Sequence, residues 1–349
     1  MIIKNKNIDL SFCNYINNCN ISYYSCGKNS IILKANLDYN IESPYLHLNY
    51  HNFKKPVHEL IIKIVFLSTN FDEDNDIFCV KINDKLTELA INEVNMFINE
   101  VNNQTNIYFK TCKDYQPICP GIVYANYFKS KENIEKIFNL FIKSTKNVSN
   151  YQIYKTKITL NNLLNIFINN IAFDSIGLIA MEYAENYKII SDFLPNNINL
   201  KSYKNMAKYL ILKLCLETGY SHGDFHLGNI MINNIIDSYV EHILGNVLLI
   251  DFGYSVKINP EILDKIKDCV DKKNYSNALL IIYNIPRLDG LDLTESNYDS
   301  YFKWLCDDVD DNELNTLFES YEYSKNVILS KSYTFDFSDN FKNYLFNGL

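Results

Sequence analysis

Two short apolar segments, residues 230–232 and 247–250, constrain how this chain can fold, because each adjoins a polar loop. The glycine-containing loop before the first segment holds Asp224 and Asn229 five positions apart. The second segment ends in Asp251, which leads into a glycine turn. Short apolar runs bounded by turn residues are typical of buried strands, and we expect these two to pair antiparallel around a variable connection. Two carboxylates and one carboxamide would then lie on neighbouring loops.

These three side chains suit one chemistry. One carboxylate can accept or orient the proton of an attacking hydroxyl, while an asparagine oxygen and a second carboxylate hold Mg²⁺ on the phosphates of a nucleotide. We therefore predict a phosphoryl-transfer site in which Asp224 is the catalytic base and Asn229 and Asp251 bind the metal. We expect His222 to brace the loop through backbone hydrogen bonds. For His226, a place near the transferred group and a structural role are both open.

The order and spacing of these residues resemble a known family. The chain has His-Gly-Asp-x-His-x-x-Asn at 222–229 and Asp-Phe-Gly at 251–253. This pair of motifs is similar to the catalytic core of the protein-kinase-like superfamily, and most similar to the branch of aminoglycoside kinases, choline kinases and atypical protein kinases. The specific motifs span only residues 219–253. The resemblance implies ATP and Mg²⁺ as cofactors and transfer of the ATP γ-phosphoryl group to a hydroxyl.

The resemblance also implies an α+β, two-lobed fold, with an antiparallel-sheet N-lobe that carries one main helix and a mostly helical C-lobe. Residues 1–20 are expected to be an N-terminal extension or capping segment. Residues 21–184 would form the N-lobe with insertions and the hinge, and residues 185–349 the helical C-lobe with the catalytic loop. Within the N-lobe, residues 130–172 show only weak helical runs and are expected to be an insertion near the lobe junction. The C-lobe is expected to contain helices at 202–218, 259–270, 276–284, 295–306 and 312–330.

The resemblance implies an N-lobe strand lysine that contacts the nucleotide phosphates and pairs with a helix glutamate. Residues 60–67 are almost continuously apolar, which indicates a strand buried on both faces, and its Lys63 needs a counter-charge if it is buried. Lys81 is the alternative, and Lys63 is favoured because its strand is the more apolar, although its spacing then requires an inserted hairpin. Residues 88–101 have helical periodicity, and Glu93 at the edge of the apolar stripe is the predicted partner of the lysine.

Two further nucleotide contacts are expected. Residues 21–34 indicate strand, turn and strand, and Gly27 in the turn is a candidate for phosphate contact. The turn has a single glycine instead of the Gly-x-Gly-x-x-Gly of protein kinases. An ordinary hairpin turn explains it equally well. By resemblance, the strand at 177–184 leads into the hinge, where backbone groups of Glu182 and Tyr183 would bind the adenine base.

The acceptor is less well defined by the sequence. A conventional protein kinase would follow Asp-Phe-Gly with an activation segment closed by Ala-Pro-Glu, its docking surface for peptide substrates, and this chain has no such closure. We therefore expect an atypical Ser/Thr-type protein kinase, with a small-molecule kinase close behind. The expected partner is a protein or a small molecule that carries a hydroxyl group. A non-catalytic pseudokinase scaffold is an alternative, because of the missing glycines. A second alternative uses the alternation of His222, Asp224 and His226, which could bind a transition metal as in a metallohydrolase.

Composition limits the setting. The 349 residues carry a formal charge of −8, which argues against generic binding to nucleic acid or to anionic membranes. The nine cysteines are odd in number and include no Cys-x-x-Cys pair, as expected for reduced thiols in a cytoplasmic compartment. We find no signal peptide at the N-terminus and no stretch long enough to span a membrane, and so expect a protein that is not secreted. The oligomeric state is left open.

Overall fold

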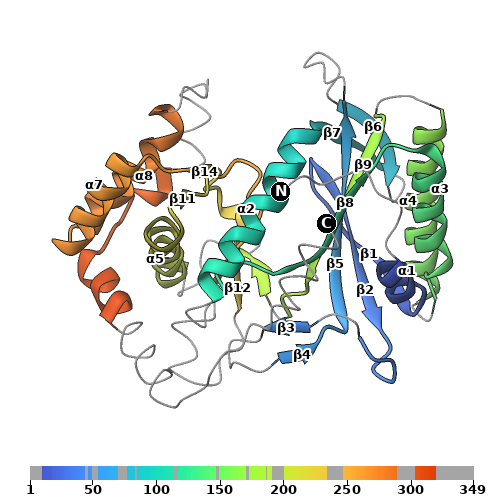
Figure 1. Cartoon of the computed structure of the whole chain (residues 1–349), viewed down its shortest axis with the longest axis horizontal. Coiled ribbons are helices and arrows are strands. Elements are labelled where there is room, and N and C mark those ends of the chain that lie inside the picture. The colour runs from blue at the N-terminus through green and yellow to red at the C-terminus, as the bar shows by residue number, and fades with distance from the viewer. Residues whose placement is uncertain are drawn as a thin grey trace.

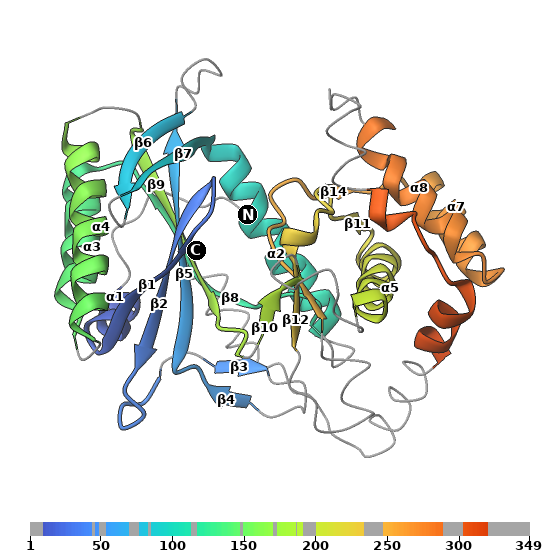
Figure 2. The same ribbon diagram turned by 180° about the vertical axis from the view of Figure 1, so that it is seen from behind.

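The computed structural model describes residues 10–43, 46–48, 54–69, 77–82, 85–112, 117–146, 149–169, 173–185, 187–190, 200–233, 247–288 and 303–319. The architecture is α+β. A large, mostly antiparallel sheet lies at one end of the molecule and a group of helices at the other (Figure 1). The view from behind shows the same separation, with one long helix running between the two ends (Figure 2).

Five antiparallel strands form the body of the sheet, in the order β1-β2-β5-β9-β8. They are β1 (Cys19–Cys26), β2 (Ser30–Leu37), β5 (Glu59–Ser68), β9 (Ser175–Glu182) and β8 (Ile122–Phe128). The central strand β5 is bonded on both sides, and residues 62–67 are all buried. The predicted strand over 60–67, buried on both faces, is confirmed. A separate small hairpin pairs β3 (Leu46–Leu48) with β4 (Lys54–Pro56).

A second hairpin is inserted between β5 and the next helix. It consists of β6 (Ile77–Ile82) and β7 (Lys85–Glu93), and the end of β7 pairs in parallel with the end of β5. Helix α2 (Val94–Cys112) follows directly. The predicted helix over 88–101 is therefore wrong in its first part, because residues 88–93 are strand. The apolar residues at 89–91 fit either period, and pairing with β6 decides between them.

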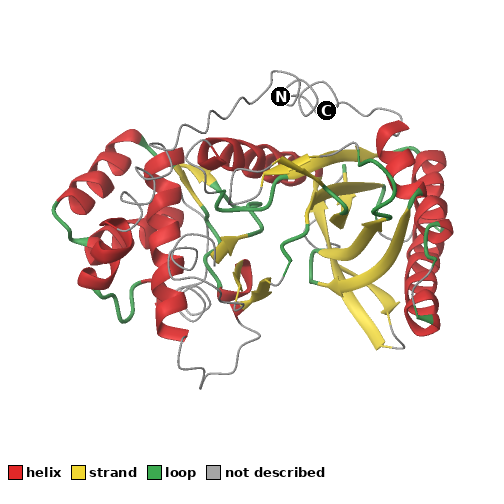
Figure 3. Ribbon diagram, turned by 90° about the horizontal axis from the view of Figure 1, so that it is seen from below, coloured by secondary structure: helices red, strands yellow, loops and turns green. Residues whose placement is uncertain are grey.

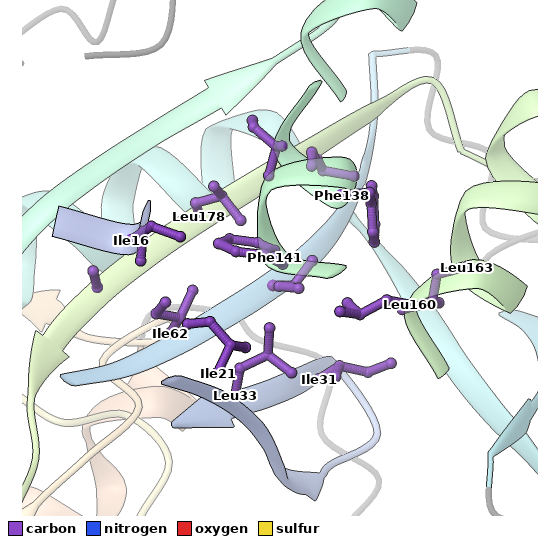
Figure 4. Close-up of a cluster of buried hydrophobic side chains, with 14 of the residues drawn as sticks. Ile16, Ile21, Ile31, Leu33, Ile62, Phe138, Phe141, Leu160, Leu163 and Leu178 are labelled. Atoms are coloured by element: carbon purple, nitrogen blue, oxygen red, sulfur yellow. The ribbon is translucent and has the colours of Figure 1, made fainter. Parts of the chain in front are cut away.

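Three helices cover one face of the sheet: α1 (Leu10–Asn17), α3 (Lys131–Lys143) and α4 (Asn150–Ile168). Their apolar side chains interdigitate with those of the strands in a continuous core (Figure 4). Phe12 of α1 stacks on Tyr124 of β8 with ring centroids 4.1 Å apart, so the described part of the predicted N-terminal extension belongs to the core. The weak helical runs expected within 130–172 are α3 and α4. The expected position near the lobe junction is wrong, because both helices cover the sheet face that points away from the helical end (Figure 1). With α1 they add three helices to the one main helix expected beside the sheet.

The opposite face of the sheet packs on α2, which extends to the helical end of the molecule. Phe97 and Val101, near its start, are buried against β5, β8 and β9, whereas Ile107 and Tyr108, near its end, are buried in the helical core. Gly177 of β9 allows the close approach of the helix. Helix α2 therefore links the two hydrophobic cores.

The helical end is built around α5 (Leu200–Thr218), α7 (Pro260–Asp271) and α8 (Tyr275–Leu288). It also contains the short helices η3 (Leu227–Asn229) and η4 (Lys303–Leu305) and a helix over 311–319. Small strands lie in this part of the molecule: β10 (Tyr187–Ile189), β12 (Ile230–Asn233) and β13 (Val247–Leu249) in one sheet, and β11 (Tyr220–Ser221) with β14 (Val256–Lys257) in another. The large sheet and these helices occupy opposite ends when seen from below (Figure 3).

Most of the predicted features of the helical end are confirmed. Helices α5, α7 and α8 lie where the periodicity placed them, and Asn259 caps α7 ahead of a proline at its start. The antiparallel pairing of β12 with β13 is also confirmed. Of the predicted helices over 295–306 and 312–330, the described residues contain η4 and the helix over 311–319, and the remainder lies outside them.

Two features of the described residues concern membrane spans and cysteines. Among the helices that the structure describes, none combines the length and apolar character required to cross a membrane. The eight cysteines whose side chains the structure describes are free thiols: Cys13, Cys19, Cys26, Cys79, Cys119, Cys215, Cys269 and Cys306.

We predict that Gly177→Ala lowers the free energy of unfolding by about 1–3 kcal/mol, the usual range for overpacking a core. A Cβ atom at this position would lie 2.4 Å from Cε2 of Phe97, whose ring is buried and cannot move aside freely. Gly27→Ala is the matched control, because a Cβ there meets no atom within 4 Å. Urea denaturation of both variants measures the difference, and equal stability of the two would contradict this packing.

Candidate functional site

The loop over 222–229, here named the Asp224 loop, is positioned by two glycines. Gly219 ends α5 with φ +71°, and Gly223 has φ +79°, both in the left-handed region that favours glycine. A Cβ atom on Gly223 would lie 1.9 Å from the carbonyl oxygen of Tyr254. Only glycine therefore allows the Asp224 loop to lie against the segment that follows Asp251.

His222 braces the Asp224 loop. Its Nε2 lies 2.9 Å from the carbonyl oxygen of Ile250, and its Nδ1 accepts a 3.4 Å hydrogen bond from the backbone N–H of Asp224. Burial lowers the pKa of His222, so the ring is neutral and donates through Nε2. Both nitrogens are thus bound to backbone groups, as expected for a bracing role.

The transition-metal alternative is not supported by this arrangement. His222 uses both ring nitrogens within the protein and has none left for a metal. Within the described ranges, no three His, Cys, Asp or Glu side chains are grouped so as to hold a metal ion. An Asn ligand lies outside that criterion, so a site built from carboxylate and amide oxygens is a separate question.

Asp224 and Asn229 contact each other directly. The Nδ2 of Asn229 donates to the carboxylate Oδ2 of Asp224 at 2.9 Å and to its backbone carbonyl at 3.1 Å. Helix η3 places Asn229 one turn beyond Asp224, and its side chain is buried. With its nitrogen held by Asp224, the amide oxygen of Asn229 is the atom left to bind a cation.

His226 flanks Asp224 on the other side. Its Nδ1 accepts a 3.0 Å hydrogen bond from the backbone N–H of Gly228, which places the proton of a neutral ring on Nε2. That Nε2 lies 3.5 Å from Oδ2 of Asp224. His226 is therefore oriented by the backbone of its own loop and presents an N–H toward the Asp224 carboxylate.

Asp251 comes from the end of the next strand. The backbone N–H of Ile250 donates to the carbonyl oxygen of Asn229 at 3.0 Å, which ties this strand end to the Asp224 loop. Asp251 itself has φ +64°, a conformation that is uncommon for non-glycine residues and that Asn and Asp tolerate best. The strained backbone directs the residue toward Lys63 of the large sheet, whose Nζ is 3.5 Å from Oδ1 of Asp251.

Lys63 is the centre of a buried ion-pair group. Its Nζ donates to Oε1 of Glu100 at 2.6 Å, and Asp251 is the second carboxylate within reach. Lys63 and Glu100 are both almost fully buried. A lone ammonium at such a depth would be very unfavourable, so the two carboxylates are what allow Lys63 to remain charged.

The predicted ion pair is thus correct for the lysine and wrong for its partner. Lys63, and not Lys81, is the buried lysine; Lys81 lies exposed on the edge strand β6. Glu93 is the exposed last residue of β7. The carboxylate that pairs with Lys63 belongs to Glu100. Because α2 begins only at Val94, its inward face is shifted along the sequence.

The charges in this site alter one another's pKa. Burial alone would lower the pKa of Lys63, but Asp251 and Glu100 outweigh it and raise the pKa above its ordinary value. Lys63 in turn lowers the pKa of Asp251. Burial raises the pKa of Asp224, and the Asp251 charge adds to this increase against the opposing effects of His226 and His222. Asp224 and Asp251 therefore interact electrostatically, and their pKa values are shifted in opposite directions: that of Asp224 is raised and that of Asp251 is lowered.

The remaining predicted residues are engaged in other contacts. The backbone N–H of Gly27 donates to Ser30 within the β1–β2 turn, and Gly27 takes part in none of the contacts described above for the site. The N–H of Glu182 donates to the carbonyl of Gly121 at 3.0 Å, and that of Tyr183 to the carbonyl of Glu59 at 3.4 Å. These two amide groups are thus already used within the protein, which leaves fewer hinge donors for an adenine base than expected.

Glu100 is the functional residue that the sequence prediction missed. It lies beside Phe97, Val101 and Gln104 on the inner face of α2, at helical spacings of three and four residues. If the helix is taken to begin at Val94, these spacings place Glu100 on the apolar face of α2 and so predict it as the buried partner of Lys63. The sequence did not show where α2 begins, because apolar residues at the end of β7 extend the helical periodicity backwards into the strand.

We predict that Glu100→Gln lowers the free energy of unfolding by about 3 kcal/mol, because it removes one partner of a buried ion pair and leaves Lys63 undercompensated. Glu93→Gln is the matched control, and at an exposed site it should change stability by less than about 0.5 kcal/mol. Chemical denaturation of both variants provides the comparison. A larger loss of stability in the Glu93 variant would contradict the Lys63–Glu100 pair and support Glu93 as the partner of Lys63.

We predict that Asp224→Asn raises the melting temperature at pH 7. A carboxyl whose pKa is raised by folding disfavours the folded state when it is ionised, and this penalty disappears as pH falls below the unfolded value near 3.8. The gain in melting temperature should therefore shrink from pH 7 to about pH 4.5. Differential scanning fluorimetry across this range measures it, and a gain that grows toward acid would show that burial does not raise this pKa.

Comparison with known proteins gives no further identification of this site. No protein-family model matches the chain, and a search of curated proteins found no match. The function is therefore inferred from the residues of the site and their geometry.

Proposed function

We propose that this chain is a kinase that uses ATP and Mg²⁺ to phosphorylate a hydroxyl group. The observation that carries the proposal is the meeting of Lys63 with Glu100 and Asp251, next to the loop in which Asp224 and Asn229 are bonded together. These five side chains come from β5, α2 and two loops of the helical end. Each has the chemical type that phosphoryl transfer requires at its place.

The architecture supports the same proposal. In the two-lobed fold that the motifs resemble, an antiparallel sheet with one main helix faces a mostly helical lobe. The five strands β1-β2-β5-β9-β8, with α2 across one face, correspond to the first lobe, and α5, α7 and α8 to the second. The inserted hairpin β6–β7 explains why Lys63 and Glu100 are 37 positions apart in the sequence. We propose this fold because the antiparallel sheet, the bridging helix and the residues of the site all suit it.

The donor set fits Mg²⁺. Magnesium in nucleotide enzymes is held by one or two carboxylates or amide oxygens together with substrate phosphates. Asp251, with its pKa lowered by Lys63, is ionised at neutral pH, and Asn229 has its amide oxygen left for a cation. When bound, ATP and Mg²⁺ would supply the transferable phosphoryl group and charge neutralisation. Asp251 and Asn229 would hold the metal.

The other side chains have distinct roles in the proposed reaction. Lys63 remains protonated and would bind the nucleotide phosphates, and Glu100 fixes its position. Asp224 would accept the proton of the acceptor hydroxyl. Its raised pKa makes it a better proton acceptor than an ordinary aspartate, since efficiency increases as the pKa of the base approaches the working pH.

The base of the nucleotide would lie beside Lys63 on the same sheet face. Ile32, Ile61 and Met181 share this face by strand register and are only half-buried. Half-buried apolar side chains next to a phosphate-binding lysine suit a planar aromatic base. Glu182 and Tyr183 would line its edge and not supply amide donors, since their N–H groups are bound elsewhere.

The proposed acceptor is a Ser or Thr hydroxyl of a protein, as in the atypical protein kinases, and a small-molecule hydroxyl is the second candidate. One observation favours a third candidate, a nucleotide-binding pseudokinase. The β1–β2 turn has one glycine and is tied down by a 2.8 Å hydrogen bond from Ala90 N–H to the carbonyl of Lys28. Transfer from γ-labelled ATP to a panel of proteins and small hydroxyl compounds separates all three. Label in proteins would support the protein kinase, and label in small molecules would support the small-molecule kinase. Binding of ATP without transfer would support the pseudokinase.

We predict that Asp251→Asn lowers Mg²⁺-dependent turnover by about 10²-fold or more, the loss typical when one electrostatic stabiliser of a transition state is removed. Asn is the appropriate substitution because it tolerates the positive φ of this position, whereas Ala would add backbone strain. Turnover is measured with γ-labelled ATP and the acceptor identified by the panel. Unchanged turnover in a folded Asp251→Asn variant would reject this site.

A further inference from the structure

Trp304, the single tryptophan of the chain, contacts the Asp224 loop. Its indole Nε1–H donates a buried 2.7 Å hydrogen bond to the carbonyl oxygen of Phe225, the residue directly after Asp224. Trp304 is 9% exposed and Phe225 is 2% exposed, so water has little access to replace the indole. A buried carbonyl without a donor is unfavourable, so this bond ties the loop to a segment 79 residues away.

The bond to Trp304 completes the fixing of the backbone at Asp224. The carbonyl of Asp224 is bound by Asn229 at 3.1 Å, and the next carbonyl, that of Phe225, is bound by Trp304. Two consecutive peptide planes are thereby held by side chains of two different segments. Because the side-chain direction of Asp224 follows from its backbone, these two bonds also hold its carboxylate in place.

Trp304 is itself firmly held. It lies in η4, and the adjacent Leu305 is fully buried in the helical core. Just beyond η4, the ammonium group of Lys208 donates to the carbonyl oxygen of Asp307. Lys208 belongs to α5 and is 1% exposed. Since α5 leads directly into the Asp224 loop, one helix anchors both the loop and the segment that braces it.

We propose that Trp304 is a positioning residue for Asp224. It holds the Phe225 peptide and so keeps the Asp224 carboxylate aimed at the acceptor hydroxyl. Trp304 acts through the loop backbone and touches neither the acceptor nor the nucleotide. The catalytic consequence rests on the proposed function, whereas the coupling between Trp304 and the loop does not. The segment at 303–307 thus has a route to control turnover.

The coupling is tested first without nucleotide, by hydrogen–deuterium exchange of the full chain. Trp304→Phe keeps an aromatic ring and removes the indole donor. It should increase exchange in the peptide covering the Asp224 loop, where Gly228 and Asn229 use their amides in local hydrogen bonds. Tyr275→Phe is the matched control: it removes a 3.3 Å hydrogen bond to Asn315 in the same core but none to the loop.

The exchange results decide the coupling. Faster exchange in the Asp224 loop with Trp304→Phe, and unchanged exchange there with Tyr275→Phe, supports the proposal. Equal effects of the two variants, or no change in the loop, overturns it. If Trp304→Phe does not fold, the wild-type chain serves, because its one indole N–H gives one resonance. That proton should exchange no faster than the loop amides, and exchange more than about tenfold faster would contradict the bond.

The catalytic part is tested by steady-state kinetics on the same variants. Trp304→Phe should lower kcat by about 10- to 100-fold, the scale of a misplaced catalytic group, with KM for ATP changed by less than about twofold, since no ATP contact is lost. Tyr275→Phe should leave kcat unchanged. A loss confined to KM, or no change in kcat, would overturn the positioning role. If wild type shows no transfer, the proposed function fails, and the exchange result still decides the coupling.

Discussion

The buried ammonium of Lys63 joins the large sheet, helix α2 and the helical end of the molecule. Its two carboxylate partners, Glu100 and Asp251, come from α2 and from the loop after β13, so three segments distant in sequence converge on one charge. An ammonium at this depth is stable only while its partners remain. The sheet, the bridging helix and the helical end therefore meet at this group of charges, in addition to the hydrophobic contacts that α2 makes with both cores. Under the proposed function, the same group would bind the nucleotide phosphates and a divalent metal.

Around this group, hydrogen bonds to the backbone fix the second part of the candidate site, the Asp224 loop. His222, Asn229 and Trp304 each hold part of the Asp224 loop, and Gly223 allows it to lie against the segment after Asp251. The site also carries stability costs: Asp224 is half-buried with a raised pKa, and Asp251 has a left-handed backbone. Strain and unfavourable burial of this kind are expected where function, rather than stability, determines the residue.

Sequence patterns predicted the local features well and the long-range contacts less well. The strand over 60–67, helix α5 and the β12–β13 pair follow from periodicity, and the motif spacing placed Asp224 and Asn229 on one loop. The partner of Lys63 could not be obtained in this way. Whether residues 88–93 are strand or helix depends on pairing with β6, and a shift in the helix start exchanges Glu93 for Glu100. The Trp304 contact has no sequence signal, because it joins loop and helix across 79 residues.

Binding of ATP to the purified full chain, measured by isothermal titration calorimetry with and without Mg²⁺, tests the central claim most directly. We expect saturable binding that is stronger with Mg²⁺ and that is lost in Lys63→Met, because the lysine would contact the phosphates. Folding of that variant is checked separately by circular dichroism. Absence of ATP binding by the wild-type chain, or binding that neither Mg²⁺ nor Lys63 affects, would contradict the account.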